Sequence, residues 1–480
     1  MRDKRQRIDE IDQKIMDLLE ERFSITKEIG LDKQKKGLTI EDKKREEEIL
    51  GKTQKYIYAE EISKIYNLLF SLNKKYQSFT YGLIGKNLEY SFSKLIYEQL
   101  GLQDYTLFQS DNFQNTVAKL NYSGLNVTNP YKKDAYSYCD LLDASAEATG
   151  VVNCIIDKTG YNTDFLAVKE IISCYHIDFT NKRIIIIGNG ATATTIEHAI
   201  GKKVVKLVRH IRGDNEYLLN DYEKFLDAHY IFNATPYGMY PNIANSFFFH
   251  LDGFKHLELV FDVVYNPLES PLLQAVKRKP IRKICGLEML FRQALINYYL
   301  FTGKKVDEPR KKYYLFKKNL LNVVFIGMSF SGKSTIGKRF ARYMNKTFID
   351  IDKELEKEGH DLNTIYEDEG IKVFREYENR KIKEVATRFS LVIATGGGVI
   401  LNDENMHYLD SNGIIIYINP SLDTLYARMD CSRPLLKNRD DLCKMFIERK
   451  AKYEKYADII INGDESDEEI GEKIDEYLSN

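Results

Sequence analysis

The stretch GMSFSGKST at residues 327–335 constrains the fold of this chain more than any other feature. The apolar run VVFI precedes it, and a helical pattern follows it from Ile336. A strand, a glycine-bounded loop and a helix in this order form a phosphate-binding loop, in which backbone N–H groups and the helix N-terminus bind phosphate oxygens. Lys333 of such a loop reaches the terminal phosphates, and Ser334 offers its hydroxyl to Mg²⁺. The sequence therefore predicts a nucleotide-binding α/β domain that begins near residue 320.

The composition is that of a folded, multidomain protein. Its 480 residues suffice for about three domains, and a hydrophobic share of 43% is enough for their cores. The net charge of −1 excludes a general attraction to nucleic acid or to an anionic membrane. The cysteines show no metal or disulfide spacing, the N-terminus is charged from its first residues, and the apolar runs are too short to span a bilayer. We therefore expect a cytoplasmic protein with neither nucleic-acid nor membrane partners.

Residues 1–78 predict an all-α domain, because apolar residues recur at helical spacing in three successive stretches. In the third stretch the inward residues are expected to be Ile62, Ile65, Leu69 and Leu72. Arg5, Arg22 and Lys33 fall in or beside the apolar register of the first stretch, where a cation is costly unless an anion meets it. The pattern alone leaves two interpretations open: a helical hairpin for dimerisation, or a site for an anionic ligand.

The text RIDEIDQKIMDLLEERFSITKEIGLDKQKKG, followed by DKKREEEIL, resembles the all-helical chorismate mutases. The resemblance implies a rearrangement of chorismate to prephenate, which needs a compact conformer and a cation at the oxygen where negative charge builds. It also implies an intertwined homodimer in which the first helix lends an arginine to the partner's site. The residues it assigns are Arg5, Arg22 and Arg45 for the carboxylates, Lys33 and Gln77 for the ether oxygen, and Asp42 and Glu46 for the hydroxyl side. Asn73 stands where many relatives have serine, and it can still hydrogen-bond.

Residues 79–303 predict two α/β lobes. In the first lobe, hydroxyls, an amide, a lysine and a carboxylate follow successive strands, and such groups suit a small polyol acid. Lys132 and Asp164 could act there as an acid–base pair on a carbinol. Taken singly, each residue is an ordinary loop group or helix cap, and together they are only suggestive. The remaining polar residues of this set are Ser91, Ser93, Thr128 and Asn153.

The second lobe carries a sharper signal, the sequence GNGATA at residues 188–193 after an apolar strand. Gly188, Gly190 and Ala193 fit the G-x-G-x-x-A form of the dinucleotide-binding fingerprint. Arg209 ends the next strand, where an arginine accommodates the 2′-phosphate of NADP and an acidic residue would favour NAD. A solvated strand end is the alternative interpretation of Arg209.

Residues 79–303 resemble shikimate dehydrogenase, with loop serines, NVTxPxK, VNC, NTD, the glycine loop and NAT in the family's order. The resemblance implies reduction of 3-dehydroshikimate with NADPH, a substrate lobe at residues 79–180, an NADP-binding Rossmann lobe at 181–285 and a returning helix at 286–303. It assigns Ser91 and Ser93 to the carboxylate, Lys132 to the proton at the carbonyl oxygen, and Thr128, Asn153, Asp164, Tyr265 and Gln293 to hydroxyls. The cofactor residues it implies are Gly188, Gly190, Ala191, Ala193, Arg209, Asn233 and Gly286. Ala191 replaces a glycine that relatives often carry.

Residues 321–480 contain further candidate residues after the phosphate loop. FIDID places Asp350 and Asp352 at a strand end, where carboxylates hold Mg²⁺ or meet an acceptor hydroxyl. A run of three glycines at residues 396–398 lets a substrate lie against bare backbone. A polar segment at residues 430–441 is interpreted as a lid that carries Arg433. The basic stretch at residues 304–320 is expected to be a solvated linker.

FIDID, FRxxE, TGGGV, RPLL and RxxxY together resemble shikimate kinase. The resemblance implies phosphorylation of shikimate with ATP. It assigns Asp352, Arg375, Gly397, Gly398 and Arg449 to shikimate, Arg433 to the transferring phosphoryl group, and Arg428 to ATP. The nucleotide and Mg²⁺ residues are Gly327, Gly332, Lys333, Ser334, Thr335 and Asp350.

The three resemblances predict a trifunctional enzyme of the shikimate pathway. Two alternatives stay open at this point: a ligand sensor built from decayed enzyme modules, and a helical head that serves only for dimerisation. Quinate is a third, narrower alternative to shikimate as the substrate of the middle segment.

Overall fold

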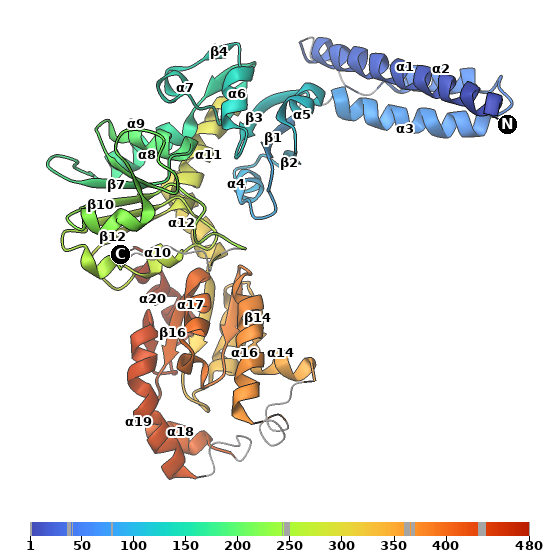
Figure 1. Ribbon diagram of the computed structural model, residues 1–480. Coiled ribbons are helices and arrows are strands. Elements are labelled where there is room, and N and C mark those ends of the chain that lie inside the picture. Colours follow the sequence, from blue (N-terminus) through green and yellow to red (C-terminus); the bar gives the residue numbers. More distant parts are fainter. Residues whose placement is uncertain are drawn as a thin grey trace. The chain divides into compact units, whose positions relative to one another are not determined.

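The computed structural model describes residues 2–35, 40, 42–77, 80–241, 243, 250–359, 365, 370–430 and 438–479. The chain divides into two compact units, and Figure 1 shows their helices and strands coloured along the sequence. The first comprises Met1–Tyr175, Thr194–Gly201 and Arg292–Asp307, and the second comprises His176–Ala193, Lys202–Phe291 and Glu308–Asn480.

The first unit begins with a head of three helices, α1 (Arg2–Lys35), α2 (Lys43–Thr53) and α3 (Ala59–Gln77). Both α1 and α2 pack against α3, and Thr53 and Ser63 share a hydrogen bond of 2.7 Å between their hydroxyls. The all-α prediction for the head is confirmed. The expectation that Ile65 points inward is wrong for the single chain, where this side chain is 58% exposed. The apolar face of α1 is also open to solvent, with Leu18 at 64%.

The first unit continues with the first lobe, a six-stranded sheet in the order β2-β1-β3-β5-β6-β4. Its strands are β1 (Thr80–Gly85), β2 (Tyr105–Gln109), β3 (Tyr122–Val127), β4 (Leu141–Leu142), β5 (Cys154–Ile156) and β6 (Thr159–Tyr161). Its helices are α4 (Ser93–Gln99), α5 (Phe113–Lys119), α6 (Lys132–Tyr138), α7 (Ala144–Thr149) and α8 (Thr163–Cys174). β1 pairs in parallel with β2 and β3, while β5 runs antiparallel to β3 and β6. The carboxyl ends of β1 and β3 therefore deliver their loops to one edge of the sheet.

The second unit begins with the second lobe, a sheet in the order β12-β11-β10-β7-β8-β9 whose pairs are all parallel. Its strands are β7 (Ile184–Ile187), β8 (Val205–Val208), β9 (Glu216–Leu218), β10 (Tyr230–Asn233), β11 (Leu259–Asp262) and β12 (Arg282–Cys285). Its helix α10 (Pro271–Gln274) lies in this unit, whereas α9 (Ala191–Ile200) and α11 (Gly286–Thr302) begin in the second unit and continue into the first. The strand β7 reads IIII and is fully buried, as expected for a parallel strand covered on both faces. This is the predicted Rossmann-like lobe.

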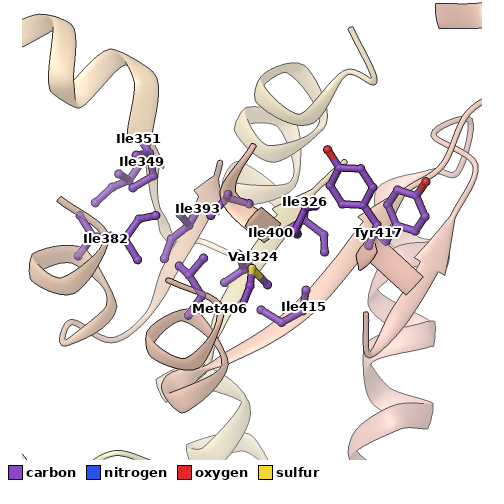
Figure 2. Close-up of a cluster of buried hydrophobic side chains, with 14 of the residues drawn as sticks. Val324, Ile326, Ile349, Ile351, Ile382, Ile393, Ile400, Met406, Ile415 and Tyr417 are labelled. Carbon is purple, nitrogen blue, oxygen red and sulfur yellow. The ribbon is translucent and has the colours of Figure 1, made fainter. Parts of the chain in front are cut away.

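The rest of the second unit is the C-terminal domain, a parallel sheet in the order β14-β15-β13-β16-β17. Its strands are β13 (Asn322–Ile326), β14 (Thr347–Asp350), β15 (Leu391–Ala394), β16 (Gly413–Ile418) and β17 (Ile459–Ile461). Its helices are α13 (Lys333–Tyr343), α14 (Ile351–Lys357), α16 (Ile371–Ala386), α17 (Asp403–Asn412), α18 (Leu422–Arg428), α19 (Arg439–Tyr456) and α20 (Asp467–Ser479). Figure 2 shows Val324, Ile393 and Ile415 of three neighbouring strands in one buried cluster. That core fixes the strand ends that carry the nucleotide and substrate residues.

The expected solvated linker at residues 304–320 is largely a helix, α12 (Pro309–Leu320). Phe316 and Leu320 are buried, and Phe316 packs against Phe291 with 5.7 Å between ring centroids. The prediction of a solvated tether, which was based on the lysines, was wrong. Tyr313, Phe316 and Leu320 follow one another at spacings of three and four residues and therefore share one apolar face of a helix.

None of the helices that the structure describes combines the length and the apolar character that a bilayer crossing requires. The structure describes five of the cysteines, and none of these five takes part in a disulfide bond.

Candidate functional sites

The phosphate loop joins β13 to α13 as predicted. Gly327 and Gly332 have φ angles of +149° and +93°, which only glycine adopts without strain. The Lys333 ammonium is buried and donates to the carbonyls of Gly327 (3.0 Å) and Met328 (2.7 Å). Ser331 Oγ, buried inside the loop, has no hydrogen-bond partner within the described part of the chain. A lysine held over a loop that contains an unsatisfied hydroxyl fits a bound phosphate chain.

The two residues predicted to hold Mg²⁺ lie together. Ser334 Oγ donates to Asp350 Oδ2 at 2.6 Å, and Asp350 also caps α14. Among the described residues no group of three or more His, Cys, Asp or Glu side chains could hold a metal ion. One hydroxyl and one carboxylate still fit Mg²⁺, which keeps several waters and takes its other ligands from substrate phosphates. Arg428 Nη1 lies 3.5 Å from the Ser331 carbonyl, at the edge of the same loop.

Three glycines at the end of β15 meet the predicted substrate residues. A Cβ atom on Gly398 would lie 1.8 Å from Arg375 Nη2, and one on Gly396 would lie 2.9 Å from Asp352 Oδ1. Arg449 Nη1 donates to the Gly397 carbonyl at 3.0 Å. Arginines and a carboxylate that approach bare backbone form a compact polar site, so the structure brings these predicted residues together.

Two further residues of this cluster were not among the predicted site residues. Glu378 is completely buried and accepts from Arg375 Nη1 at 2.6 Å, and Tyr453 donates its hydroxyl to the Gly397 carbonyl. Burial raises the pKa of the Glu378 carboxyl above its ordinary value, and Arg375 opposes that rise. The motifs FRxxE and RxxxY contain both residues, and the helical spacing of three residues between Arg375 and Glu378 was the signal that could have identified the pair.

The glycine loop of the second lobe follows β7. A Cβ atom on Gly188 would lie 2.8 Å from Thr235 Cγ2, whereas one on Gly190 would meet nothing within 4 Å. α9 begins at Ala191, and its third residue, Ala193, is buried. β7 and β8 are parallel neighbours, so Arg209, which is exposed just beyond β8, lies at the same sheet edge as the loop. An open loop before a helix N-terminus with an arginine on the neighbouring strand fits a pyrophosphate and a 2′-phosphate.

A buried polar network supports this edge of the second lobe. Asn233 donates to Asp262 Oδ1 at 2.8 Å and accepts from Thr235 N at 3.0 Å. Asp262 also accepts from Val264 N at 3.0 Å and from Ser270 Oγ at 2.5 Å. The predicted cofactor residue Asn233 therefore holds the loop that contacts Gly188, while Asp262 and Ser270 were missed because they carry no local pattern. At Gly286 a Cβ atom would lie 2.1 Å from the Val263 carbonyl, which explains the glycine by close packing.

The Asp262 network predicts a pH-dependent stability of the second lobe. Burial raises the pKa of Asp262 to about 7, although its three hydrogen-bond donors oppose the rise. A carboxyl group with a higher pKa in the folded state binds more protons when folded, so its contribution to stability is lost as the pH rises from about 4 to about 7. We expect Asp262→Asn to remove this loss, because the amide keeps an acceptor for Asn233 and can donate to Ser270.

The measurement compares urea midpoints of the natural side chain and Asp262→Asn between pH 4 and pH 8, followed through a tryptophan at Phe254 in this lobe. The chain contains no tryptophan, so the signal is specific. The advantage of the variant should grow as the pH rises and level off above pH 7. A constant difference across that range would contradict the prediction.

The first lobe brings Lys132 and Asp164 into direct contact. Lys132 starts α6, Asp164 lies in the first turn of α8, and Lys132 Nζ lies 2.6 Å from Asp164 Oδ2. The side chains are only 10% and 12% exposed. A nearly buried ammonium–carboxylate pair at strand-end loops can exchange a proton with a ligand that replaces part of its water shell.

The other predicted substrate residues lie in loops, at helix ends and, in the case of Gln293, in the middle of α11. Asn153 Oδ1 accepts from Thr163 N at 2.7 Å, which ties its loop to the start of α8. Ser91 Oγ donates to Ser93 Oγ at 3.2 Å, and Gln293 Oε1 accepts from Asn297 at 2.7 Å. Thr128 follows directly after β3. Tyr265, beyond β11, belongs to the second unit.

In the head, the predicted cations and their partners lie on all three helices. Arg22 Nη1 donates to Asn73 Oδ1 at 2.8 Å, and Lys33 Nζ donates to the Ile40 carbonyl at 2.7 Å. Asp42 caps α2 by accepting a hydrogen bond from Arg45 N, and the Arg45 side chain pairs with Glu48. Glu46 pairs with Lys74, and Arg5 is exposed. The side chain of Gln77 and the whole of Arg433 lie outside the described residues.

Family models match three separate segments of the chain. One described as chorismate mutase type II matches residues 4–78, one described as shikimate dehydrogenase substrate binding domain matches residues 83–155, and one described as shikimate kinase matches residues 330–479.

Curated relatives cover the same segments. A shikimate dehydrogenase (NADP(+)) of Methanococcus maripaludis strain C6 is 30% identical over 258 residues, which are 47% of this chain and 92% of the relative. A shikimate kinase of a Sulfurihydrogenibium species is 38% identical over 146 residues, which are 30% of this chain and 88% of the relative. Among solved structures, a chorismate mutase/shikimate 5-dehydrogenase fusion protein from Clostridium acetobutylicum is 23% identical, with a TM-score of 0.45 and coverage of 50% of this chain and 98% of that chain.

Proposed function

The chain belongs to the shikimate dehydrogenase and shikimate kinase families and carries a chorismate mutase domain, and from this premise we propose how its residues perform the three reactions. The enzyme reduces 3-dehydroshikimate to shikimate with NADPH, phosphorylates shikimate with ATP, and rearranges chorismate to prephenate. The observation that carries the proposal is that residues far apart in the sequence meet in each segment, as Lys132 and Asp164 do at 2.6 Å. The sensor alternative is not favoured, because each segment keeps its charged residues.

In the dehydrogenase segment, Lys132 gives a proton to the carbonyl oxygen of 3-dehydroshikimate, and NADPH, when bound, would supply the hydride. Asp164 orients the ammonium and binds a substrate hydroxyl, because its carboxylate is the hydrogen-bond partner of Lys132. Ser91 and Ser93 bind the carboxylate, and Thr128, Asn153, Tyr265 and Gln293 bind the remaining hydroxyls. The glycine loop, Ala191 and Ala193 hold the pyrophosphate, Arg209 takes the 2′-phosphate, and Asn233 and Gly286 shape the site.

In the kinase segment, the phosphate loop binds ATP, and Lys333 neutralises charge on its β- and γ-phosphates. Ser334 and Asp350 would hold Mg²⁺, and Thr335 and Arg428 would contact the nucleotide. Arg375 and Arg449 bind the shikimate carboxylate against Gly397 and Gly398, and Asp352 orients the attacking hydroxyl. Arg433 stabilises the transferring phosphoryl group. Glu378 fixes Arg375 in place through its buried carboxylate.

In the helical head, Arg5, Arg22 and Arg45 bind the carboxylates of chorismate, and Asp42, Glu46 and Asn73 hold its hydroxyl side. Lys33 and Gln77 stabilise the ether oxygen as its bond breaks. The head forms a homodimer, because the apolar residues of α1 that would otherwise form a core are exposed in the single chain. These residues include Ile8 (55%), Ile15 (48%) and Leu18 (64%). We place the enzyme in the cytoplasm, because the spacing of its six cysteines shows no disulfide pattern.

Lys33→Ala is expected to lower the turnover of chorismate about a hundredfold, since removal of one donor to a developing oxyanion has an effect of this size. Helicity should be retained, because the loss concerns one side-chain bond to the Ile40 carbonyl. Mutase kinetics and circular dichroism of the variant and of Lys14→Ala, an exposed lysine of the same helix, test this. Retained turnover in Lys33→Ala would remove the lysine from the site.

One purified preparation of the full chain tests the proposal as a whole. It is assayed with chorismate, with 3-dehydroshikimate plus NADPH, and with shikimate plus ATP and Mg²⁺. We expect turnover in all three assays. Binding of the metabolites without turnover would favour the sensor, and failure of the chorismate assay alone would reduce the head to a dimerisation unit. Quinate replaces shikimate in a fourth assay to settle the substrate preference.

A further inference from the structure

A buried ion cluster joins the second lobe to the C-terminal domain within the second unit. Lys277, which follows α10 in the second lobe, has its Nζ 2.5 Å from Asp410 Oδ1 and 2.8 Å from Asp458 Oδ2 of the C-terminal domain. The side chains of the three residues are 4%, 9% and 3% exposed. Removal of one partner from such a buried cluster leaves a charge without compensation, which is strongly destabilising.

Two hydrogen bonds beside the cluster also join the second lobe to the C-terminal domain. Glu269 N donates to the Ser411 carbonyl at 2.8 Å, and the Gln274 side chain donates to the His407 carbonyl at 3.1 Å. The Ser411 carbonyl lies in the last turn of α17, whose last four carbonyls have no partner within the helix, and the His407 carbonyl lies one turn earlier. The second lobe therefore completes the C-terminal end of a helix that belongs to the neighbouring domain.

The charge of Lys277 suits this position. Burial alone would lower its pKa, but the Asp410 and Asp458 carboxylates more than offset burial and raise the pKa above its ordinary value. A cation is also favoured near the C-terminus of α17, which carries the negative end of the helix dipole. At the rim, Arg278 Nη2 donates to the Tyr456 carbonyl at 2.6 Å, and the same atom lies 3.5 Å from Asp458 Oδ1.

Asp458 is in turn tied into the kinase sheet. Its Oδ2 accepts from Ile415 N at 2.9 Å, and its Oδ1 accepts from the Tyr477 hydroxyl at 3.1 Å. Ile415 lies in β16, the direct neighbour of the strand that leads into the phosphate loop. Asp458 therefore connects Lys277 directly to the sheet of the C-terminal domain.

We propose that the segment from Leu268 to Arg278 of the dehydrogenase is a docking surface for the kinase domain, and that the two fold as one body. The stability of the kinase domain then depends on Lys277, a side chain of the dehydrogenase segment. This dependence goes beyond the catalytic assignments, since neither reaction requires it.

The test follows the unfolding of the kinase alone, through a tryptophan at Phe446 in α19 as the only tryptophan of the chain. In this background, Lys277→Ala is expected to lower the thermal midpoint of the kinase by about 6 °C or more, because Asp410 and Asp458 lose their cation. Lys279→Ala is the matched control. Lys279 pairs with the exposed Asp252 within its own lobe, so its replacement should shift the kinase midpoint by less than about 1 °C.

Equal kinase midpoints in Lys277→Ala and Lys279→Ala would overturn the proposal, because a kinase that is not docked cannot sense Lys277. If Lys277→Ala does not fold, Arg278→Ala decides in its place, since its half-exposed guanidinium bonds only at the rim. A decrease of about 2 °C is then expected, and an unchanged midpoint overturns the proposal. The readout is fluorescence, so a failure of the catalytic assignments leaves this test intact.

Discussion

Replacement of Lys333 by alanine is expected to abolish the phosphorylation of shikimate while the same preparation still oxidises NADPH with 3-dehydroshikimate at its normal rate. The Lys333 ammonium is buried and lies 2.7 Å from the Met328 carbonyl, so its charge is held where the loop meets phosphate. Negative charge shifts among the phosphate oxygens during phosphoryl transfer, and a fixed cation in a water-poor site stabilises that shift. We expect kcat to fall by about a thousandfold.

The controls separate chemistry from folding. Lys338→Ala removes an exposed lysine from the same helix and should leave phosphorylation within about twofold of normal. Lys333→Arg keeps the positive charge but replaces the compact ammonium with a larger, planar guanidinium group. It should therefore recover only a small part of the activity that Lys333→Ala loses. The dehydrogenase rate of each preparation reports its integrity. A parallel loss of both activities in Lys333→Ala would mean that the change acts through folding, and the assignment of Lys333 would fail.

The features that could be predicted from the sequence are those in which a strand and its following loop carry the signal together. The phosphate loop, the glycine loop after β7 and the three glycines after β15 are of this kind, because parallel strands bring their carboxyl ends to one edge. Lys132 and Asp164 were predicted as a pair although 32 residues separate them, since both follow strands of one lobe.

The features that could not be predicted join residues without any local pattern. Lys277 lies 133 residues from Asp410 and 181 residues from Asp458, and nothing near any of them in the sequence distinguishes a buried ion from a surface charge. In the sequence Asp262 is likewise only an aspartate at the end of a strand. Its importance follows from its hydrogen bonds with Asn233 and Ser270, which become known only from the structure. The solvated linker was predicted from its lysines, and the aromatic residues that fix α12 became decisive only once their packing partners were known.

Lys132→Met is expected to lower the reduction of 3-dehydroshikimate by about a thousandfold to ten-thousandfold, at the upper end of what a positioned proton donor contributes. Methionine matches the length of the lysine stem and removes only the ammonium. The KM for NADPH should stay unchanged, because the cofactor residues lie on the second lobe. Lys133→Met, a change of the neighbouring exposed lysine, should leave the rate as it is.

The variant also leaves Asp164 with a nearly buried charge and no cation, so a loss of rate could reflect a disturbed lobe. The double change Lys132→Met/Asp164→Asn removes both charges and should restore the thermal stability that the single change lowers, because a neutral pair of similar volume replaces the ion pair. Its dehydrogenase activity should nevertheless stay as low as that of Lys132→Met. Recovery of turnover together with stability would show that the ammonium only holds the fold. A stable double variant without turnover would show that a restored fold does not restore the reaction, which therefore needs the charged Lys132–Asp164 pair itself.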